Sequence, residues 1–567
     1  MANLAARHEA ARDAVRQRAE GRLLVLGIVF FCAFLMVGAK MSVLAASDLQ
    51  EPKAAASGAQ IVAARADITD RNGRILATNL TTHALYAQPP HMIDPKRAAK
   101  ELARIFPDLD EEDLQRKFSG KRKFVWIKRR ISPEQQQQVF DIGDPGLLFG
   151  PREMRLYPNG RMAAHVLGGA SFGREGVTSA EVIGVAGIEK AMDEELRDPG
   201  RGDVPLQLSL DLTVQAAVER VLTGGMRLMN AKGAAAVLMD VHSGEIVSLA
   251  SLPDFDPNDR PRPLTRGDQA ESPLFNRAVQ GVYELGSTYK VFAAAQGIDE
   301  KLVSGSTWID TKGPLTWGRH KIRDLRDHGP ALTVEDVIVK SSNIGTARIA
   351  MMIGPERQQD FLARLGLMKP TPVELVEASG ARPLLPKKWA EIHAMTVSYG
   401  HGISASPLHL AAAYAAMVNG GLKVEPTLLT QDNVAPGPRV MSANTSKQMR
   451  GMLRKVVSEG TASLGDVVGY HVGGKTGTAD KPRPEGGYYD DKVIATFASV
   501  FPAHDPKYVL VVTLDEPVDT TGRKPRRTAG WTAVPVSAEV IRRVAPLLGM
   551  APDVDFSTQP GVTLARN

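Results

Sequence analysis

The chain has 567 residues, of which 43% are hydrophobic and 23% are charged, and its formal net charge at pH 7 is +6. This composition is that of an ordinary globular protein and excludes a disordered one, and the length is sufficient for two or more domains. No basic stripe interleaved with aromatic residues is present, so nothing indicates nucleic-acid binding. The single cysteine, Cys32, excludes an intramolecular disulfide and a cysteine-based metal site, and the histidines lack ligand spacing. We therefore expect no metal and no cofactor.

The first element in chain order is an uninterrupted apolar run, Leu23 to Ala39, which can extend to Ala46 with one lysine as its only charge. A helix of this length can span a bilayer. Basic residues outnumber acidic ones in 1–22, which predicts a cytoplasmic tail there and places the rest of the chain outside the cytoplasm. A cleaved signal peptide is the alternative, but its apolar core should be shorter. We therefore expect an uncleaved transmembrane anchor at 23–46.

The next region, 61–222, follows a polar linker at 47–60 and mixes short strands with helices. The pair Asn72-Gly73 is a strong turn signal between two short apolar runs and predicts a β-hairpin. Asp211 is a predicted helix cap. The other predicted elements are helices over Lys96–Ile105 and Asp110–Phe118, a helix ending near Arg197, a strand over Leu206–Leu210 and a helix from Asp211 to about Leu222.

A second region, 231–549, has strands at both of its sequence ends and helices between them. This order predicts an α+β fold with one antiparallel sheet flanked by helices. The short polar tail at 550–567 is predicted to be disordered. The predicted elements are a hairpin of Ala234–Met239 and Glu245–Ala250, helices through most of 287–457, strands over Val493–Phe501 and Tyr508–Leu514, and a last helix over Val534–Leu548.

The sequence Ser287-Thr288-Tyr289-Lys290 is the only Ser-x-x-Lys in the chain. Gly286 can supply an entry turn to a helix beginning at Ser287, and residues at i and i+3 share a helix face, so Lys290 can take the serine proton. The helix N-terminus also favours negative charge on the serine oxygen. For this motif alone, a capping serine followed by a solvated lysine is the alternative.

Two sequences downstream fit Ser-x-Asn, namely Ser341-Ser342-Asn343 and Ser442-Ala443-Asn444. Ser442 opens a helical pattern and is interpreted as a helix cap. Ser341 instead follows a short apolar stretch and precedes another, so it lies in a polar turn that can point into a cleft. In that position Ser341 can relay a proton, and Asn343 can hydrogen-bond a substrate amide.

The third motif, Lys475-Thr476-Gly477-Thr478, precedes two apolar runs that predict paired strands. It is therefore expected on a strand, where the glycine lets a substrate backbone approach. A glycine-rich strand edge is the alternative. Ser-x-x-Lys, Ser-x-Asn and Lys-Thr-Gly in this order are typical of serine enzymes that are acylated by a β-lactam or a D-Ala-D-Ala peptide. The three motifs together predict acyl transfer through a serine ester.

From about Ile61 to Gly549 the sequence resembles the class B penicillin-binding proteins. Asn343, in place of the aspartate usual in elongation-type members, makes it similar to division-type members, the FtsI-like or penicillin-binding protein 3 type. Leu285 stands where proline is common, and Ala66 where glycine is usual. Other segments that carry the resemblance are Arg65–Gly73, Arg155–Pro158, Gly187–Glu189, Ser251–Pro253, Asp256–Asn258, Val337–Gly345, Tyr399–Ile403 with Pro407-Leu408, and Thr528–Trp531.

The resemblance implies a β-lactamase/transpeptidase-like domain at 231–549 on a pedestal (dimerisation-type) domain at 61–222, in a single-pass inner-membrane protein with a periplasmic catalytic domain. It implies a D,D-transpeptidase that crosslinks peptidoglycan stem peptides at the division septum and is acylated by β-lactams. A SEDS-type, FtsW-like glycosyltransferase and other divisome proteins are the implied partners. The alternatives are an elongation-type transpeptidase, a serine β-lactamase, and an assembly scaffold with a vestigial site.

The expected mechanism begins with attack of Ser287 on the penultimate D-Ala carbonyl. Lys290 is the expected base, with its pKa lowered by burial beside the cationic Lys475. Tyr488 and Tyr489, in the loop 479–492, either pack or contact substrate. The backbone N–H groups of Ser287 and Thr478 are expected to form the oxyanion hole, and the hydroxyls of Thr476 and Thr478 to bind the terminal carboxylate. The expected catalytic residues are Ser287, Lys290, Ser341, Asn343 and Lys475. The expected oxyanion-hole and substrate-binding residues are Ser287, Thr476, Gly477 and Thr478.

Overall fold

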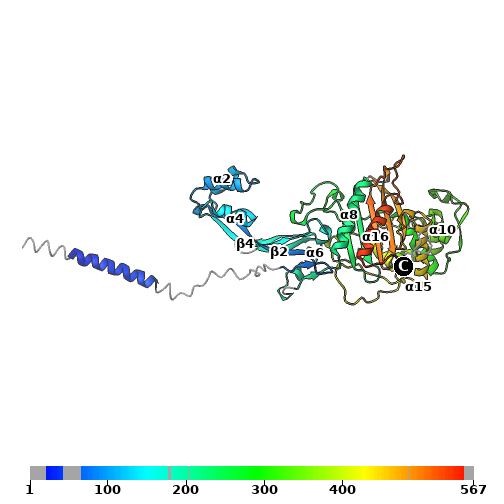
Figure 1. Cartoon of the computed structure of the whole chain (residues 1–567), viewed down its shortest axis with the longest axis horizontal. Coiled ribbons are helices and arrows are strands. Elements are labelled where there is room, and N and C mark those ends of the chain that lie inside the picture. Colours follow the sequence, from blue (N-terminus) through cyan, green and yellow to red (C-terminus); the bar gives the residue numbers. More distant parts are fainter. Residues whose placement is uncertain (1–20, 42–64, 176–179, 202–203, 484, 554–567) are drawn as a thin grey trace, which may run out of the picture. The chain divides into compact units, whose positions relative to one another are not determined.

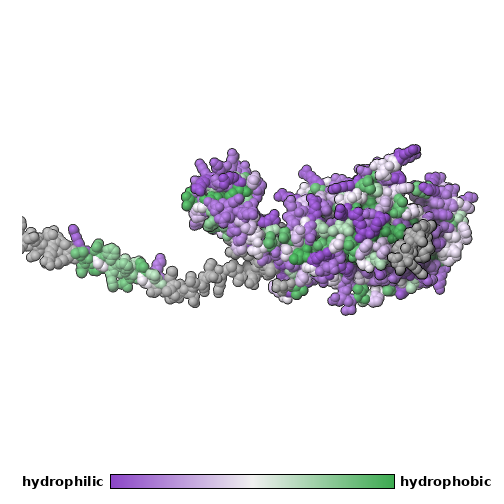
Figure 2. Space-filling model, in the orientation of Figure 1, coloured by the Kyte–Doolittle hydropathy of each residue, from purple (hydrophilic) through white to green (hydrophobic). Residues whose placement is uncertain are grey.

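The computed structural model describes residues 21–41, 65–175, 180–201, 204–483 and 485–553. The chain divides into two compact units, Met1–Ile61 and Val62–Asn567. In the first unit, the described part is one helix, Gly21–Met41, which is long and apolar enough to cross a membrane. Its surface is apolar around the visible side (Figure 2), and all of its large hydrophobic side chains are exposed. Residues 1–20 of the predicted tail, the predicted linker, the last five residues of the predicted anchor, and residues 554–567 lie outside the described residues.

The second unit begins with a five-stranded sheet in the order β3-β2-β1-β7, with β4 also paired to β2. The predicted hairpin is present, and the Asp70 carboxylate accepts the N–H groups of Asn72 and Arg74 in its turn. The predicted strand from Leu206 is only two residues long, because the N–H of Ser209 donates to Leu428 and not to the sheet. The strands are β1 (Ile68–Thr69), β2 (Ile75–Ala87), β3 (Val125–Ile131), β4 (Leu147–Leu156) and β7 (Leu206–Gln207).

Three short helices close one end of this sheet around a separate apolar core that includes Leu85, Leu102, Phe106 and Leu114. Each begins at a side-chain cap that satisfies a free N–H group of its first turn. The sequence periodicity predicted two of the three. The helices are α2 (Pro95–Ile105), α3 (Glu111–Phe118) and α4 (Pro133–Phe140), with caps Asp94, Asp110 and Ser132.

The opposite end of this sheet is held by a buried ion-pair network centred on Glu189. Its carboxylate accepts hydrogen bonds from Arg65 Nε and Arg155 Nε, both at 2.7 Å, and from the Tyr157 hydroxyl at 3.2 Å. All four side chains are buried, so removal of one would leave an uncompensated charge or polar group. The elements around it are α5 (Ala164–Leu167), β5 (Gly169–Glu175), β6 (Ala180–Ala186), α6 (Gly187–Ala191) and α7 (Asp193–Leu196).

The rest of the second unit is built on one five-stranded sheet in the order β14-β15-β16-β8-β9, and every pairing in it is antiparallel. The last strand in sequence, β16, pairs with β8, so the two ends of the region meet in the middle of the sheet. The predicted single antiparallel sheet is therefore confirmed. The strands are β8 (Gly233–Asp240), β9 (Ile246–Leu252), β14 (Gly473–Pro482), β15 (Tyr488–Phe501) and β16 (Tyr508–Asp515).

Helices cover both faces of this sheet (Figure 1). Helices α8 (Leu212–Leu228) and α16 (Ala533–Leu547) pack together on one face, and α14 (Pro407–Val418) and α15 (Ala443–Ser458) contact the other. Helix α8 continues six residues past its predicted end, through two glycines. It does so because Gly225 packs directly against Val536 of α16, where a Cβ would lie 2.7 Å from a Val536 methyl group.

Between β9 and α14 the chain forms a helical layer that carries the first two sequence motifs. The prediction of helices through most of 287–457 omitted two small two-stranded sheets, whose three-residue strands are too short for an alternating pattern to stand out. The helices are η5 (Gly286–Tyr289, a 3-10 turn), α9 (Lys290–Asp299), α10 (Val334–Val339), α11 (Asn343–Ile353), α12 (Pro355–Arg364) and α13 (Glu391–Ser398); the strand pairs are β10 (Trp308–Asp310) with β13 (Ala331–Thr333), and β11 (Leu315–Trp317) with β12 (His320–Ile322).

Candidate active site

Ser287 lies in the 3-10 turn η5, and Lys290 is the first residue of α9. A 3-10 helix has three residues per turn, so the two side chains lie on the same side, as the sequence predicted for an α-helix. Gly286 supplies the entry turn with φ +56°, and a Cβ there would lie 2.7 Å from the Thr478 carbonyl oxygen. We call residues 282–287 the nucleophile loop. It lies in contact with β14.

Packed aromatic side chains support the 3-10 turn that carries Ser287. Tyr289, Phe292 and Tyr414 are buried and make edge-to-face contacts with ring centroids 5.5 and 5.6 Å apart. The Tyr414 hydroxyl donates a 2.8 Å hydrogen bond to the carbonyl of Thr288, the residue after Ser287. This hydrogen bond connects the turn that carries Ser287 to helix α14, on which Tyr414 lies.

The hydroxyl of Ser341 lies between two buried lysines. Lys290 Nζ donates to Ser341 Oγ at 3.1 Å and to the Ser341 carbonyl at 2.5 Å, and Lys475 Nζ donates to Ser341 Oγ at 2.9 Å. Ser341 has φ +65°, a left-handed conformation that is strained for a residue with a Cβ. This conformation turns the carbonyl and the hydroxyl of Ser341 toward the same nitrogen, Lys290 Nζ.

Burial changes the proton affinity of both lysines. The pKa of Lys290 is held well below its ordinary value, first by loss of hydration and then by repulsion from Lys475, and Asp324 opposes the shift only in part. Burial lowers the pKa of Lys475 to about 7. A neutral Lys290 can accept a proton from a neighbouring hydroxyl, which a cationic lysine cannot do.

Asp324 positions the second motif and was not predicted from the sequence. Its carboxylate accepts the Ser342 hydroxyl at 2.7 Å and the backbone N–H groups of Asn343 at 2.5 Å and Ile344 at 3.0 Å. The Asn343 side chain donates to the Arg323 carbonyl at 2.8 Å, which leaves its amide oxygen available. Asp324 lies in an irregular loop after β12, where no periodicity or motif distinguishes it.

The third motif lies on β14, as predicted. The Thr478 hydroxyl accepts the Ala529 N–H at 3.0 Å, so its own proton remains free to be donated. The Thr476 hydroxyl shares a 2.8 Å hydrogen bond with Thr461. Gly477 makes room for the nucleophile loop, because a Cβ there would lie 2.1 Å from the Leu285 carbonyl oxygen.

The structure thus brings all three motifs together around Ser341. Within the part of the chain that the structure describes, no hydrogen bond joins the Ser287 hydroxyl to Lys290; such contacts are often longer in an enzyme without substrate. The rival Ser-x-Asn lies elsewhere, since Ser442 caps α15 as predicted and accepts the Thr445 N–H at 3.1 Å.

The two tyrosines of the loop 479–492 make different contacts. The Tyr488 hydroxyl donates to Glu284 in the nucleophile loop at 3.0 Å. The Tyr489 ring packs against the cationic groups of Arg483 and Lys492, 5.2 and 4.9 Å from its centroid. Tyr488 therefore connects β15 to the nucleophile loop, whereas Tyr489 packs on its own hairpin.

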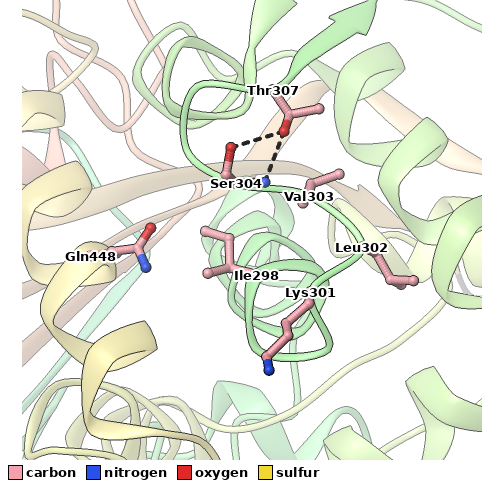
Figure 3. A pocket seen from close by; sticks show the side chains of 7 residues that line it. All are labelled: Ile298, Lys301, Leu302, Val303, Ser304, Thr307 and Gln448. Carbon is pink, nitrogen blue, oxygen red and sulfur yellow. Dashed lines mark hydrogen bonds between the residues drawn. The ribbon is translucent and has the colours of Figure 1, made fainter.

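A hollow of about 430 Å³ lies at the far end of α9 and contains none of the predicted site residues. Figure 3 shows Ser304 and Thr307 hydrogen-bonded to each other at its edge, with a hydroxyl–hydroxyl distance of 3.0 Å. Its lining contains one charged side chain, that of Lys301, and no acid–base pair, so we do not assign a function to this hollow. Its lining residues are Ile298, Lys301, Leu302, Val303, Ser304, Thr307 and Gln448.

The contact at Gly477 leads to a prediction. Gly477→Ala is expected to push β14 away from the nucleophile loop, because the clashing atom is a backbone carbonyl that cannot rotate aside. We expect a loss of about 1–3 kcal/mol in the free energy of unfolding. We also expect acylation about 100-fold slower, since a displacement of about 1 Å can have that effect. Thermal unfolding and the rate of labelling by a fluorescent penicillin measure both quantities.

Gly451→Ala is the matched control, because Gly451 lies in α15 and a Cβ there would contact nothing within 4 Å. It should leave labelling unchanged and stabilise the helix by up to about 1 kcal/mol. Normal labelling by the Gly477→Ala protein would show that the close approach of loop and strand has no importance for the site.

The chain matches two known protein families. Residues 234–533, more than half of the chain, match the family described as penicillin binding protein transpeptidase domain. Residues 60–201 match the family described as penicillin-binding protein dimerisation domain.

Two curated relatives match over most of their length. The probable peptidoglycan D,D-transpeptidase FtsI of Caulobacter vibrioides is 34% identical over 563 residues, which cover 97% of this chain and 92% of that protein. Peptidoglycan D,D-transpeptidase FtsI of Escherichia coli K12 is 29% identical over 524 residues, covering 87% and 85%. Among solved structures, penicillin binding protein 3 of Mycobacterium tuberculosis complexed with aztreonam has a TM-score of 0.64 and 26% identity, and covers 87% of this chain and 98% of that one.

Proposed function

Because the chain belongs to the penicillin-binding protein transpeptidase family, we propose that it is a peptidoglycan D,D-transpeptidase that crosslinks stem peptides through an ester on Ser287. The observation that carries the proposal is the contact of Lys290 Nζ and Lys475 Nζ with one hydroxyl, that of Ser341. This arrangement provides a neutral base beside the nucleophile turn and a path by which a proton can leave it.

Acylation begins when Lys290 takes the Ser287 proton and Ser287 Oγ attacks the carbonyl carbon of the penultimate D-Ala. The negative charge that develops on the carbonyl oxygen is stabilised by the backbone N–H groups of Ser287 and Thr478. The bond from carbon to the leaving nitrogen then breaks. The Ser341 hydroxyl donates its proton to that nitrogen and receives one from Lys290, which restores the neutral lysine and releases D-Ala.

Deacylation reverses these proton movements with a different amine. The acceptor amine of a neighbouring stem attacks the ester carbon and gives its proton to Ser341, from which it passes through Lys290 to Ser287 Oγ as the ester bond breaks. Because the same groups act in both directions, no additional base is required.

Substrate binding uses the remaining polar groups of the site. The free hydroxyl proton of Thr478, with Thr476 beside it, is suited to the donor's terminal carboxylate. The Asn343 amide oxygen is suited to a backbone N–H of the donor peptide, since its amide nitrogen is already bound to Arg323. The orientation of Asn343 is set by Asp324, which holds the start of α11.

The helix Gly21–Met41 supports a single-pass anchor, with the N-terminus in the cytoplasm and the catalytic domain in the periplasm. We further propose that the protein works at the division septum of the inner membrane, beside an FtsW-like glycosyltransferase and other divisome proteins. The FtsI names of its relatives support the septal role. An elongation-type role is the alternative and is distinguished by depletion: filamentous cells support division, whereas rounded cells support elongation.

The full chain, purified in detergent, provides the direct test of activity. Incubation with a pentapeptide ending in D-Ala-D-Ala and an amine acceptor should release D-Ala and yield the crosslinked peptide, and penicillin should leave a stable adduct on the peptide containing Ser287. A folded protein that neither releases D-Ala nor forms an adduct would support the scaffold alternative. Rapid hydrolysis of penicillin would support the β-lactamase alternative.

A further inference from the structure

Glu284 joins three segments that meet beside the nucleophile. It lies three residues before Ser287, and its side chain is 10% exposed. One carboxylate oxygen accepts the Gly402 N–H at 2.9 Å and the Tyr488 hydroxyl at 3.0 Å, and the other lies 3.2 Å from His401 Nδ1. The nucleophile loop, the loop 399–402 and β15 therefore share one carboxylate.

The backbone contacts of the same segments reach the reacting serine. Gly400 has φ +76°, and a Cβ there would lie 2.0 Å from the carbonyl oxygen of Gly286, the residue before Ser287. On its other side Gly286 contacts Thr478. The distance between the two proposed oxyanion N–H groups, those of Ser287 and Thr478, thus depends on how closely the loop 399–402 is held.

His401 is the residue of this arrangement whose protonation can change. Its ring lies between those of Tyr399 and Tyr488, with centroids 6.4 and 5.1 Å away, and its side chain is about half exposed. In the described part of the chain, the Glu284 oxygen that faces it has no other hydrogen-bond donor. A proton on Nδ1 gives that buried oxygen a partner, whereas an unprotonated Nδ1 would oppose it with a lone pair.

We propose that Glu284 is a positioning residue that holds the nucleophile loop against the loop 399–402 and β15, and that the charge on His401 sets how firmly it does so. This inference rests on the proposed function of Ser287. Glu284 acts through the backbone of its own loop, and the acyl transfer itself is left to Ser287, Lys290 and Ser341.

The groups facing His401 determine the direction of the pH effect. The hydrogen bond that His401 donates to Glu284 raises the pKa of His401 above its ordinary value of 6.5. Burial opposes the rise, and the charges of Glu284 and of Asp480 on β14 add to it. Tyr399 and Tyr488 stay neutral, since burial raises the pKa of both hydroxyls. The ion pair is therefore complete below pH 6.5 and is lost as the pH rises through the raised pKa of His401.

The test measures the second-order rate of acylation by a fluorescent penicillin between pH 5.5 and 9 on the full chain. Wild type should lose about two- to fivefold of its rate on the alkaline side, the size of effect expected from a partly exposed ion pair. H401Q keeps a donor for Glu284 but does not titrate, so this alkaline decline should disappear. H471Q is the control: the His471 side chain is about as exposed as that of His401 and lies 3.1 Å from the exposed carboxylate of Asp553, and this variant should behave as wild type.

A second pair of variants separates positioning from folding. E284A leaves the Gly402 N–H and the Tyr488 hydroxyl without an acceptor and should slow acylation by about 10- to 100-fold. E284Q can still accept both hydrogen bonds and donate to His401 Nδ1, so it should recover to within about threefold of wild type while losing the alkaline decline. Neither variant carries the negative charge of Glu284, so the difference in acylation rate between E284Q and E284A measures how much the hydrogen bonds position the nucleophile loop.

Two results would overturn the inference: pH profiles of wild type and H401Q that coincide, or E284A acylated as fast as wild type. If E284A does not fold, E284Q takes its place in the second result: a folded E284Q protein that is acylated about 10- to 100-fold more slowly than wild type would overturn the inference. A wild-type protein with no acylation at any pH would instead remove the proposed function of Ser287, which is a separate outcome.

Discussion

Ser287→Ala is expected to abolish covalent labelling by penicillin, with a loss of at least about 10⁴ in rate, because Thr288 and Tyr289, the other hydroxyl-bearing residues of the turn, are buried. Folding should be unaffected, since the Ser287 hydroxyl caps no helix and is only partly buried. Labelling of the full chain with a fluorescent penicillin, together with thermal unfolding, measures both expectations.

Ser442→Ala is the control for this experiment, because Ser442 begins the other Ser-x-Asn sequence in the chain. It should keep normal labelling and lose about 1 kcal/mol of stability with its helix cap. A stable adduct on the Ser287→Ala protein would identify a different nucleophile and reject the assignment.

Lys290→Ala is the second variant with a large expected effect. General-base catalysis contributes about 10²–10⁴-fold, so acylation should slow by that factor. In wild type the rate should rise with pH through the lowered pKa of Lys290, because only the neutral amine accepts the serine proton. This acid limb should be absent from the Lys290→Ala protein. Acylation rates measured between pH 5 and 9 give both results.

Variants of two other lysines test whether the role of base belongs to Lys290 specifically. Lys475→Ala removes the charge that adds to burial in lowering the pKa of Lys290, so the acid limb of the remaining activity should move to higher pH. Lys340→Ala removes a lysine next to Ser341 whose side chain is exposed and pairs with Asp336 on its own helix, and it should leave the rate unchanged. Near-normal acylation by the Lys290→Ala protein would reject Lys290 as the base.

Much of the site could be predicted because each motif expresses a local backbone requirement. Ser287 and Lys290 share a side at a spacing of three residues in a 3-10 turn as in an α-helix, so the inference held although the type of helix differed. Asp211 and Ser442 cap the helices that they were expected to cap. These outcomes depend on neighbours within one turn, which the sequence displays directly.

The remaining features depend on segments that are distant in sequence. Asp324, which holds Ser342 and Asn343, comes from an irregular loop with no pattern of its own. The left-handed conformation of Ser341 exists because Lys290 and Lys475 hold it from two other elements. The end of α8 is another example: the helix was predicted to end at about Leu222, but it continues to Leu228, where Gly225 allows close contact with Val536 of α16.

The amino-acid sequence alone was thus enough to predict the reaction class, the apolar N-terminal segment, the central antiparallel sheet with its flanking helices, and the three motifs that the fold brings together. The close contact of Gly477 with the nucleophile loop, and the meeting of Glu284, His401 and Tyr488 beside that loop, became evident only from the folded domain. The physical reason is that a motif specifies its own backbone and side chains. The position of one segment against another follows instead from packing and hydrogen bonds across the whole domain.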